Sequence, residues 1–314
     1  MILLASPGQG AQAPGFLQPW LELSGVADRL AWWSAVTGLD LVRYGTTADA
    51  EEIRDTAVAQ PLLVAAALAA CEALYPDGTR PDAVAGHSVG ELAAAAIAGV
   101  LSPEAALVLV RERGRAMAQA AAVTETGMTA VLGGDADEVL AAIDKHGLTP
   151  ANVNGAGQIV AAGTTAQLAA FADEPPAKAR LRSLSVAGAF HTEHMAPAVD
   201  TLRRLAPGAP VADPATTLLS NRDGAVIGSG REYLGRLVEQ VSAPVRWDAC
   251  MATMRELGVT AIIELPPAGT LVGLAKRELK DAGVQTLALK TPDDLDKARE
   301  MIEAHTSRIE AHTS

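Results

Sequence analysis

Residues 82–100 read DAVAGHSVGELAAAAIAGV, and this stretch decides the fold class. The short apolar run 82–86 predicts a buried strand, and the alanine-rich run 91–100 predicts a helix directly after it. Between them, residues 86–90 read GHSVG, which fits G-x-S-x-G. At a sharp strand-to-helix turn of this kind the serine Oγ is exposed, and the next backbone amide points into an oxyanion hole. The stretch therefore predicts that Ser88 is a nucleophile on an α/β sheet.

The flanking sequence extends the α/β pattern in both directions. An apolar strand is expected at the N-terminus, helices before and after the serine, and two further strands late in the chain. Alternating strands and helices indicate a parallel sheet with helices on both faces. The expected strands are 2–6, 259–264 and 285–289, and the expected helices are 60–74, opened by Pro61, and 103–121.

Between residues 120 and 188 the order of elements changes. It becomes β-α-β-β-α-β, which is the ferredoxin-like order. We therefore expect a discontinuous core domain, 1–119 and 189–300, and an inserted subdomain, 120–188. The last residues, 301–314, contain a duplicated hexapeptide and are interpreted as a helix end and a flexible tail. The strands of the insert are expected at 127–132, 151–154, 158–162 and 180–186, and its helices at 135–145 and 165–172.

The composition limits which cellular compartment and which partners are expected. Of the 314 residues 49% are apolar and 3% aromatic, which supports a large core built from aliphatic side chains. A net charge of −12 argues against nucleic acid and anionic membranes as partners. Cys71 and Cys250 form no CxxC pattern, and residues 1–5 lack a basic leader. The apolar run 62–71 is about half a membrane span. We expect a cytoplasmic protein, and a monomer by default.

A serine nucleophile needs a base, and the six histidines allow selection by elimination. The histidines in the tail, at the end of a helix and within the serine turn itself are set aside. His191 and His194 remain as candidates for the base. The pair could also ligate a metal, but no third ligand is evident, so no metal is expected. No Asp or Glu stands out as a partner behind the histidine. A backbone or amide carbonyl could orient the ring instead.

These motifs together resemble the malonyl-CoA:acyl carrier protein transacylase family of bacterial fatty acid and polyketide synthesis. The resemblance covers nearly the whole chain, and it implies a hydrolase-like α/β core with a ferredoxin-like insert. It implies no cofactor. The motifs that carry it are PGQG at 7–10, QP at 60–61, GHSVGE at 86–91, RG at 113–114, GAFH at 188–191 and PVRW at 244–247.

The resemblance also implies a role for each matching residue. Ser88 is the acylated nucleophile, and His191 is its base. The backbone carbonyl of Gln240 holds His191, and the amides of Gln9 and Val89 form the oxyanion hole. By this likeness the enzyme moves malonyl from malonyl-CoA to the phosphopantetheine thiol of a holo acyl carrier protein.

Substrate recognition is expected to centre on Arg113, which the resemblance assigns to the malonyl carboxylate. A guanidinium binds a carboxylate through two parallel hydrogen bonds, so a buried one selects malonyl over acetyl. By spacing alone, Arg113 could instead belong to a solvated helix face. Phe190 fits malonyl-specific members of the family, because a bulky ring crowds an α-methyl branch. Further pocket candidates are Gln60, Met117 and Asn154, with packing or strand polarity as the alternatives.

Carrier docking needs a basic area on this acidic chain, and two clusters qualify: Lys178, Arg180 and Arg182, or Lys276, Arg277 and Lys280. Three other functions remain open. A serine esterase or thioesterase shares the nucleophile and histidine. A dinucleotide-binding protein is suggested by GQGAQA at 8–13, although Pro14 and Gly15 interrupt the helix that should follow. A non-catalytic carrier-docking module is the third.

Overall fold

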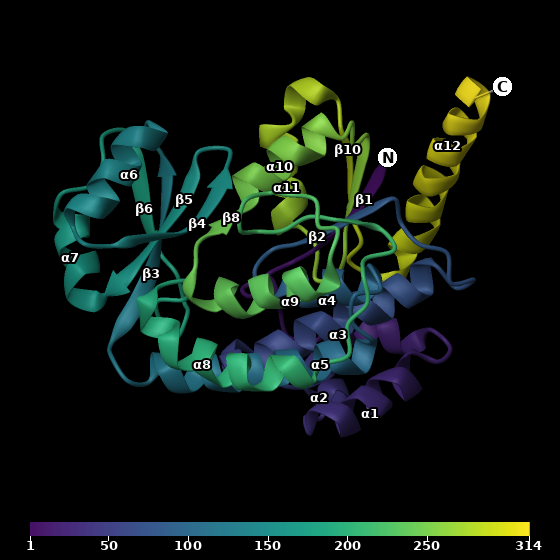
Figure 1. Ribbon diagram of the computed structural model, residues 1–314, viewed down its shortest axis with the longest axis horizontal. Helices are drawn as coiled ribbons and strands as arrows, with labels where there is room; N and C mark the ends of the chain where they lie inside the picture. Colours follow the sequence, from purple (N-terminus) through teal and green to yellow (C-terminus); the bar gives the residue numbers. More distant parts are fainter. Residues whose placement is uncertain (314) are drawn as a thin grey trace.

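The computed structural model describes residues 1–313, and two five-stranded sheets organise it (Figure 1). All neighbours in sheet A are parallel, as expected from the α/β pattern. Its order is β10 (Gln285–Ala288), β9 (Ala261–Glu264), β1 (Ile2–Ser6), β2 (Ala83–Gly86) and β7 (Thr217–Leu218). The predicted first strand is thus the central one, and β2 delivers the serine turn beside it.

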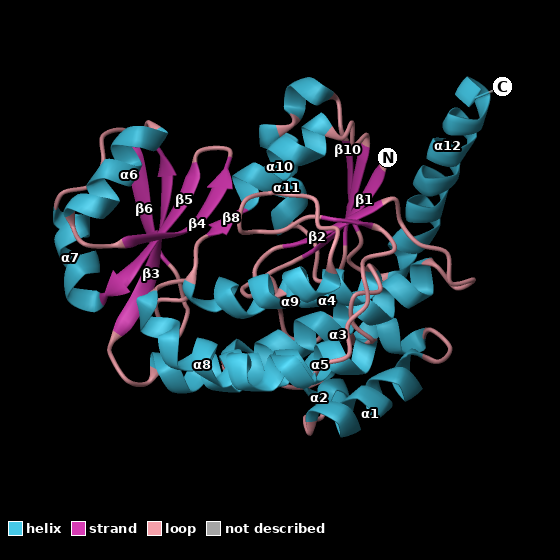
Figure 2. Cartoon of the chain, viewed as in Figure 1, coloured by secondary structure: helices cyan, strands magenta, loops and turns pink. Residues whose placement is uncertain are grey.

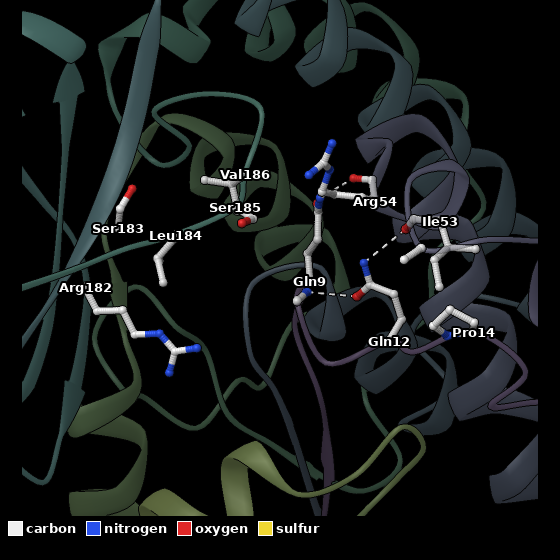
Figure 3. Close-up of a pocket in the computed structure, with 12 residues that line it drawn as sticks. Gln9, Gln12, Pro14, Ile53, Arg54, Arg182, Ser183, Leu184, Ser185 and Val186 are labelled. Carbon is white, nitrogen blue, oxygen red and sulfur yellow. Dashed lines mark hydrogen bonds between the residues drawn. The ribbon is translucent and has the colours of Figure 1, made fainter.

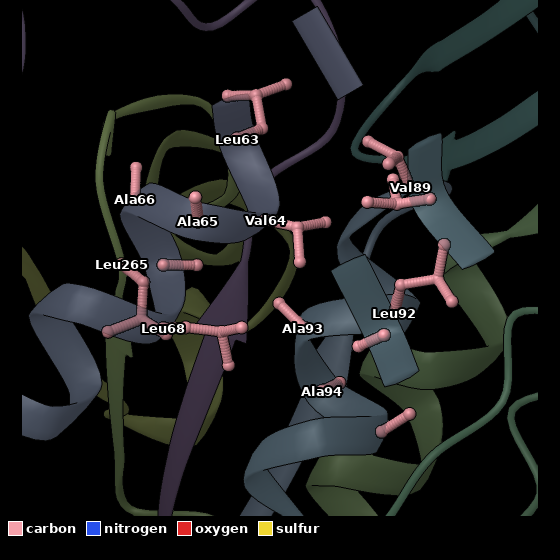
Figure 4. Close-up of a cluster of buried hydrophobic side chains, with 14 of the residues drawn as sticks. Leu63, Val64, Ala65, Ala66, Leu68, Val89, Leu92, Ala93, Ala94 and Leu265 are labelled. Atoms are coloured by element: carbon pink, nitrogen blue, oxygen red, sulfur yellow. The ribbon is translucent and has the colours of Figure 1, made fainter. Parts of the chain in front are cut away.

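Alternation along β1 explains how both faces of sheet A are covered. Ile2 and Leu4 join the cluster that contains α3 (Thr56–Leu74), α4 (Gly90–Ile97) and α5 (Pro103–Ala121). Leu3 and Ala5 join the cluster of α10 (Trp247–Glu256) and α11 (Thr270–Glu278). Successive side chains of a strand point to opposite faces, so one apolar run serves both helix layers. Small side chains on α3 and α4, such as Ala65 and Ala93, let the helices and sheet pack closely (Figure 4).

Sheet B carries the insert and stands apart from sheet A in Figure 2. Its order is β6 (Ala179–Ser183), β3 (Thr126–Gly133), β5 (Gln158–Thr164), β4 (Thr149–Gly155) and β8 (Val245–Arg246). With α6 (Ala136–Lys145) and α7 (Thr165–Asp173), the first four strands have the predicted ferredoxin-like order and pairing. The fifth strand, β8, was not predicted. It comes from the later core segment and pairs with β4 in parallel.

Helix α3 begins earlier than predicted, and Pro61 lies inside it instead of opening it. The Asp55 side chain accepts a hydrogen bond from the Ala57 amide and caps the helix at Thr56. Proline lacks the N–H that would bond the carbonyl four residues earlier. That carbonyl, on Ala57, accepts a hydrogen bond of 2.9 Å from Arg111 Nη1. A side chain of α5 therefore replaces the missing bond, which allows the helix to continue through the proline.

By length and composition alone, helix α3 could cross a membrane. The apolar run 62–71, which is shorter than the helix, did not predict this. Within the described residues α3 is the one such helix, and 78% of its apolar window is buried inside the protein. It packs against α4 and α5 in the main core, as the core helix of a globular protein does.

The remaining helices complete the outer layers. Helix α12 extends to Thr313, so the expected flexible tail from residue 301 is helical within the described residues (Figure 1). These remaining helices are α1 (Val26–Thr37), α2 (Leu41–Thr46), α8 (Ala196–Leu205), α9 (Gly230–Glu239) and α12 (Leu295–Thr313).

Candidate active site

Ser88 stands at a strained turn between β2 and α4. Its φ is +53°, a left-handed conformation that non-glycine residues seldom adopt. The flanking glycines make the turn possible. A Cβ on Gly86 would lie 2.0 Å from the carbonyl carbon of Gly90, and one on Gly90 would lie 2.2 Å from the Ser6 oxygen. The Ser88 amide donates a 2.7 Å hydrogen bond to Asn221 Oδ1, which fixes the backbone at the turn.

His191 faces the serine from the start of the segment that follows the insert. The Ser88 Oγ and His191 Nε2 atoms are 2.7 Å apart, and His191 Nδ1 lies 2.8 Å from the Gln240 carbonyl oxygen. A carbonyl only accepts, so Nδ1 carries the proton and Nε2 accepts from the serine hydroxyl. His191 itself has a φ of +62°. His194, the other candidate base, lies in the short 3-10 helix Glu193–Met195.

The environment keeps His191 uncharged. Its side chain is buried, and burial, followed by the nearby charge of Arg113, lowers the pKa of His191 to about 3. The imidazole is therefore neutral at physiological pH, the form that accepts a proton from a hydroxyl. Within residues 1–313 no group of three His, Cys, Asp or Glu side chains is arranged to hold a metal ion.

Arg113 is buried beside the nucleophile and does not lie on a solvated helix face. Only 2% of it is exposed, and burial lowers its pKa to about 10, which leaves it charged at neutral pH. Its Nη2 lies 3.3 Å from Ser88 Oγ and 2.9 Å from Gln240 Oε1, while Nη1 donates to Gln60 Oε1 at 2.6 Å. Every one of these acceptors is neutral. The cation is thus held next to Ser88 by neutral acceptors.

Two buried polar residues that sequence reasoning missed complete the site. Asn221 binds the serine turn, and Glu91 accepts hydrogen bonds from the Asn221 amide, at 2.6 Å, and from Gln240 Nε2. Glu91 was quoted as part of a motif but was given no role. Its position three residues after Ser88, in an otherwise apolar helix, was the available signal. Asn221 had none, because nothing local marks residue 221 as a neighbour of residue 88.

Of the two residues predicted to form the oxyanion hole, Val89 directly follows Ser88, and Gln9 follows β1, the neighbour of β2 in sheet A. In the described part of the chain, the amides of Gln9 and Val89 donate no hydrogen bond to another protein group. Val89 precedes the first turn of α4, where the helix dipole adds positive potential. The Gln9 side chain is anchored separately, through Nε2, to Thr56 Oγ1 at 3.2 Å.

The other predicted pocket residues divide into two groups. Gln60, Met117 and Phe190 are buried, and Gln60, which contacts Arg113, has its Nε2 3.4 Å from Met117 Sδ. Asn154 lies on the insert instead, where its Oδ1 is 2.9 Å from His87 Nε2. His87 accordingly points from the turn toward sheet B.

Two hollows meet at Gln9, between the core and the insert. One, of about 360 Å³, is lined by Gln9 and Arg54 on the core side and by Arg182 and Ser185 on the insert side (Figure 3). The other, of about 230 Å³, is lined by Gln9, His87 and Asn154 among others. The second hollow reaches the serine turn at His87.

The fold and the site define a class of enzyme, the serine-dependent acyltransferases. The family model described as the acyl transferase domain matches residues 6–314. A curated malonyl CoA-acyl carrier protein transacylase from Mycobacterium tuberculosis is 56% identical over 300 residues, covering 95% of this chain and 99% of that protein. The chain belongs to the malonyl CoA-acyl carrier protein transacylase family.

Solved structures agree. The crystal structure of the transacylase from Mycobacterium tuberculosis superposes with a TM-score of 0.91 at 55% identity, covering 95% of this chain and 99% of that one. A malonyl-transacylase in complex with its type II PKS acyl-carrier protein superposes with a TM-score of 0.87 at 29% identity, covering 95% and 99%. The predicted combination of a parallel-sheet core with a ferredoxin-like insert is thereby confirmed.

Proposed function

We propose that this enzyme transfers malonyl from malonyl-CoA to the phosphopantetheine thiol of an acyl carrier protein, by way of malonyl-Ser88. The observation that carries the proposal is the buried guanidinium of Arg113, 3.3 Å from the Ser88 hydroxyl. A fixed cation at that distance suits an acyl group whose far end is a carboxylate. An esterase for neutral acyl groups has no use for it.

The reaction is proposed to begin when the malonyl carboxylate replaces neutral contacts of Arg113. His191 takes the Ser88 proton as Oγ attacks the thioester carbonyl carbon, and the Gln240 carbonyl stabilises the imidazolium through Nδ1–H. The amides of Gln9 and Val89 bind the oxyanion. The C–S bond then breaks, His191 returns its proton to the departing CoA thiolate, and malonyl-Ser88 remains. A carrier thiol attacks it in the same manner, with His191 again as base.

The proposed partners follow from this chemistry and from the relatives. A malonyl-transacylase of the same fold has been solved with its acyl-carrier protein, which supports a protein carrier as the second substrate. We place the enzyme in the cytoplasm as a monomer. Two free cysteines, Cys71 and Cys250, support a reducing compartment.

Intact-protein mass spectrometry tests the proposal. Mixing with malonyl-CoA should add one malonyl group, and adding a reduced holo acyl carrier protein should move that group to the carrier. Ser88→Ala should take up no malonyl. An adduct that decays equally fast in buffer alone would identify a hydrolase, and a wild-type protein without any adduct would contradict the proposal.

A further inference from the structure

The carboxylate of Glu91 is buried below the site, and the proposed mechanism does not use it. Glu91 lies in the first turn of α4 and is 1% exposed. Burying a carboxylate is costly unless hydrogen bonds compensate for the lost water. Two donors do so here, the Asn221 amide and the Gln240 side-chain Nε2. Each donor belongs to a residue that contacts the catalytic groups.

The first branch runs from Glu91 through Asn221 to the nucleophile. Asn221 Oδ1 accepts from the Ser88 amide at 2.7 Å, and Asn221 Nδ2 donates to the Gly86 carbonyl at 2.7 Å. One side chain therefore binds the backbone on both sides of His87, directly before the serine. Glu91 fixes the backbone from which that side chain extends.

The second branch runs from Glu91 through Gln240 to His191, the base, and to Arg113, the cation proposed to bind the substrate. A side-chain amide has nearly the same shape after a half-turn, so its partners decide which end is oxygen. Gln240 Nε2 donates to the Glu91 carboxylate and also to the Ser88 carbonyl oxygen, 3.1 Å away, which leaves Oε1 directed at Arg113 Nη2, 2.9 Å away. After a half-turn Nε2 would face the guanidinium, donor against donor. The Gln240 backbone oxygen meanwhile accepts from His191 Nδ1.

We propose that Glu91 is a positioning residue that sets the orientation of the Gln240 amide and thereby the position of Arg113 for the malonyl carboxylate. The inference rests on the proposed function, since it assigns Arg113 to that carboxylate. Glu91 contacts neither substrate nor the reacting atoms. Its effect reaches them through Gln240 and Asn221.

The charge state of Glu91 supports a measurable consequence. Burial raises the pKa of Glu91 to about 7, against the opposing effects of its hydrogen bonds and of the Arg113 charge. The other titratable groups facing it are Tyr233 and Cys250, and burial raises the pKa of both. Protonation would turn one Glu91 oxygen into a donor facing donors. The hold on Gln240 should therefore weaken as the pH falls through neutrality.

The decisive experiment compares Glu91→Gln with Glu264→Gln in the full-length protein. Glu264 is also fully buried, but its carboxylate accepts from the Gly269, Leu271 and Val272 amides at the start of α11, with no contact to the site. Both variants are assayed for Ser88 acylation by malonyl-CoA and by acetyl-CoA, and for thermal unfolding. Each variant replaces a buried carboxylate with a neutral amide of nearly the same shape. A merely structural effect should therefore appear in both variants.

We expect Glu91→Gln to lower the malonyl-over-acetyl preference by about tenfold or more, the scale of one charge-assisted contact, whereas Glu264→Gln keeps it. An unchanged preference in folded Glu91→Gln, or an equal loss in both variants, would overturn the inference while leaving malonyl transfer by the wild type intact. A wild type that forms no malonyl adduct would overturn the proposed function as well.

A wild-type pH series decides the matter if Glu91→Gln does not fold. The malonyl carboxylate stays ionised from about pH 5.5 to about pH 8.5, and the pKa of His191, about 3, lies below that range. The malonyl-over-acetyl preference should fall as the pH is lowered through about 7, where Glu91 takes up a proton. A preference that stays constant across the range would overturn the inference.

Discussion

At the scale of single residues, we propose that the buried Arg113 guanidinium selects the acyl group. Arg113→Ala should lose about tenfold to a hundredfold in malonyl-over-acetyl preference, the equivalent of roughly 1.5–3 kcal/mol for a charge-assisted hydrogen bond. Single-turnover acylation with the two CoA thioesters measures it. Arg115→Ala is the matched control, because Arg115 lies on the same helix, is exposed and pairs with Glu112. A full preference retained by Arg113→Ala would remove Arg113 from substrate binding.

His191 and His194 form a second residue-scale pair, three positions apart. His191→Ala should slow both acylation and transfer by about 10²-fold to 10⁴-fold, since general-base catalysis contributes on that scale. His194→Ala should behave like the wild type, because the imidazole bonded to Ser88 is that of His191. Rapid-quench measurement of each half-reaction tests both. Equal losses in the two variants would contradict the assignment of the base.

At the scale of elements, the strand-to-helix turn depends on the absence of two Cβ atoms. Gly90→Ala would bring a Cβ within 2.2 Å of the Ser6 oxygen, in the neighbouring strand β1. Backbone cannot yield as a flexible side chain does, so we expect destabilisation by more than about 3 kcal/mol or failure to fold. Denaturant unfolding measures it.

The control for this prediction should change stability in the opposite direction. Gly235 lies within α9, is exposed, and a Cβ there would meet nothing within 4 Å. Gly235→Ala should therefore stabilise the protein by about 0.5–1 kcal/mol, the helix-propensity difference. A Gly90→Ala protein as stable as the wild type would mean that the turn can relax.

Elements also show what local sequence can and cannot predict. The strand-turn-helix around Ser88 and the order of the insert follow from apolar periodicity and glycine placement, which are local. The predicted start of helix α3 lies too far along the chain because Pro61 is typical of a helix start. The side chain that binds the Ala57 carbonyl, that of Arg111, is about 50 residues away in the sequence. Asn221 was missed for the same reason. Contacts that join distant segments leave no periodic signature in either one.

At the scale of the whole molecule, the proposed docking of a carrier needs a local basic area on this acidic protein. Of the two basic clusters, Lys178, Arg180 and Arg182 lie on or beside β6, and Arg182 lines the pocket that reaches Gln9 (Figure 3). Neutralising these three should weaken transfer to the carrier and spare acylation by malonyl-CoA, because local charge complementarity governs association. Carrier-dependent kinetics measure the difference.

The other cluster supplies the control for that prediction. Lys276, Arg277 and Lys280 are exposed on α11 and just after it, and none of the three lines either hollow at Gln9. Neutralising them should leave both half-reactions close to the wild type. Equal losses from the two triple variants, or equal losses in both half-reactions, would exclude the β6 cluster as the docking area.

The short strand β8 has a consequence for anyone exchanging parts between relatives. Val245 and Arg246 belong to the chain after the insert, yet they complete the sheet of the insert beside β4. A graft that transplants only 120–188 would pair β4 with the fifth strand of the recipient protein. A poor match there would leave the edge of β4 unpaired and open to association with other chains. A chimaera that carries residues 244–247 together with the insert keeps the pairing of β4 with β8. The exchangeable unit is therefore discontinuous in sequence.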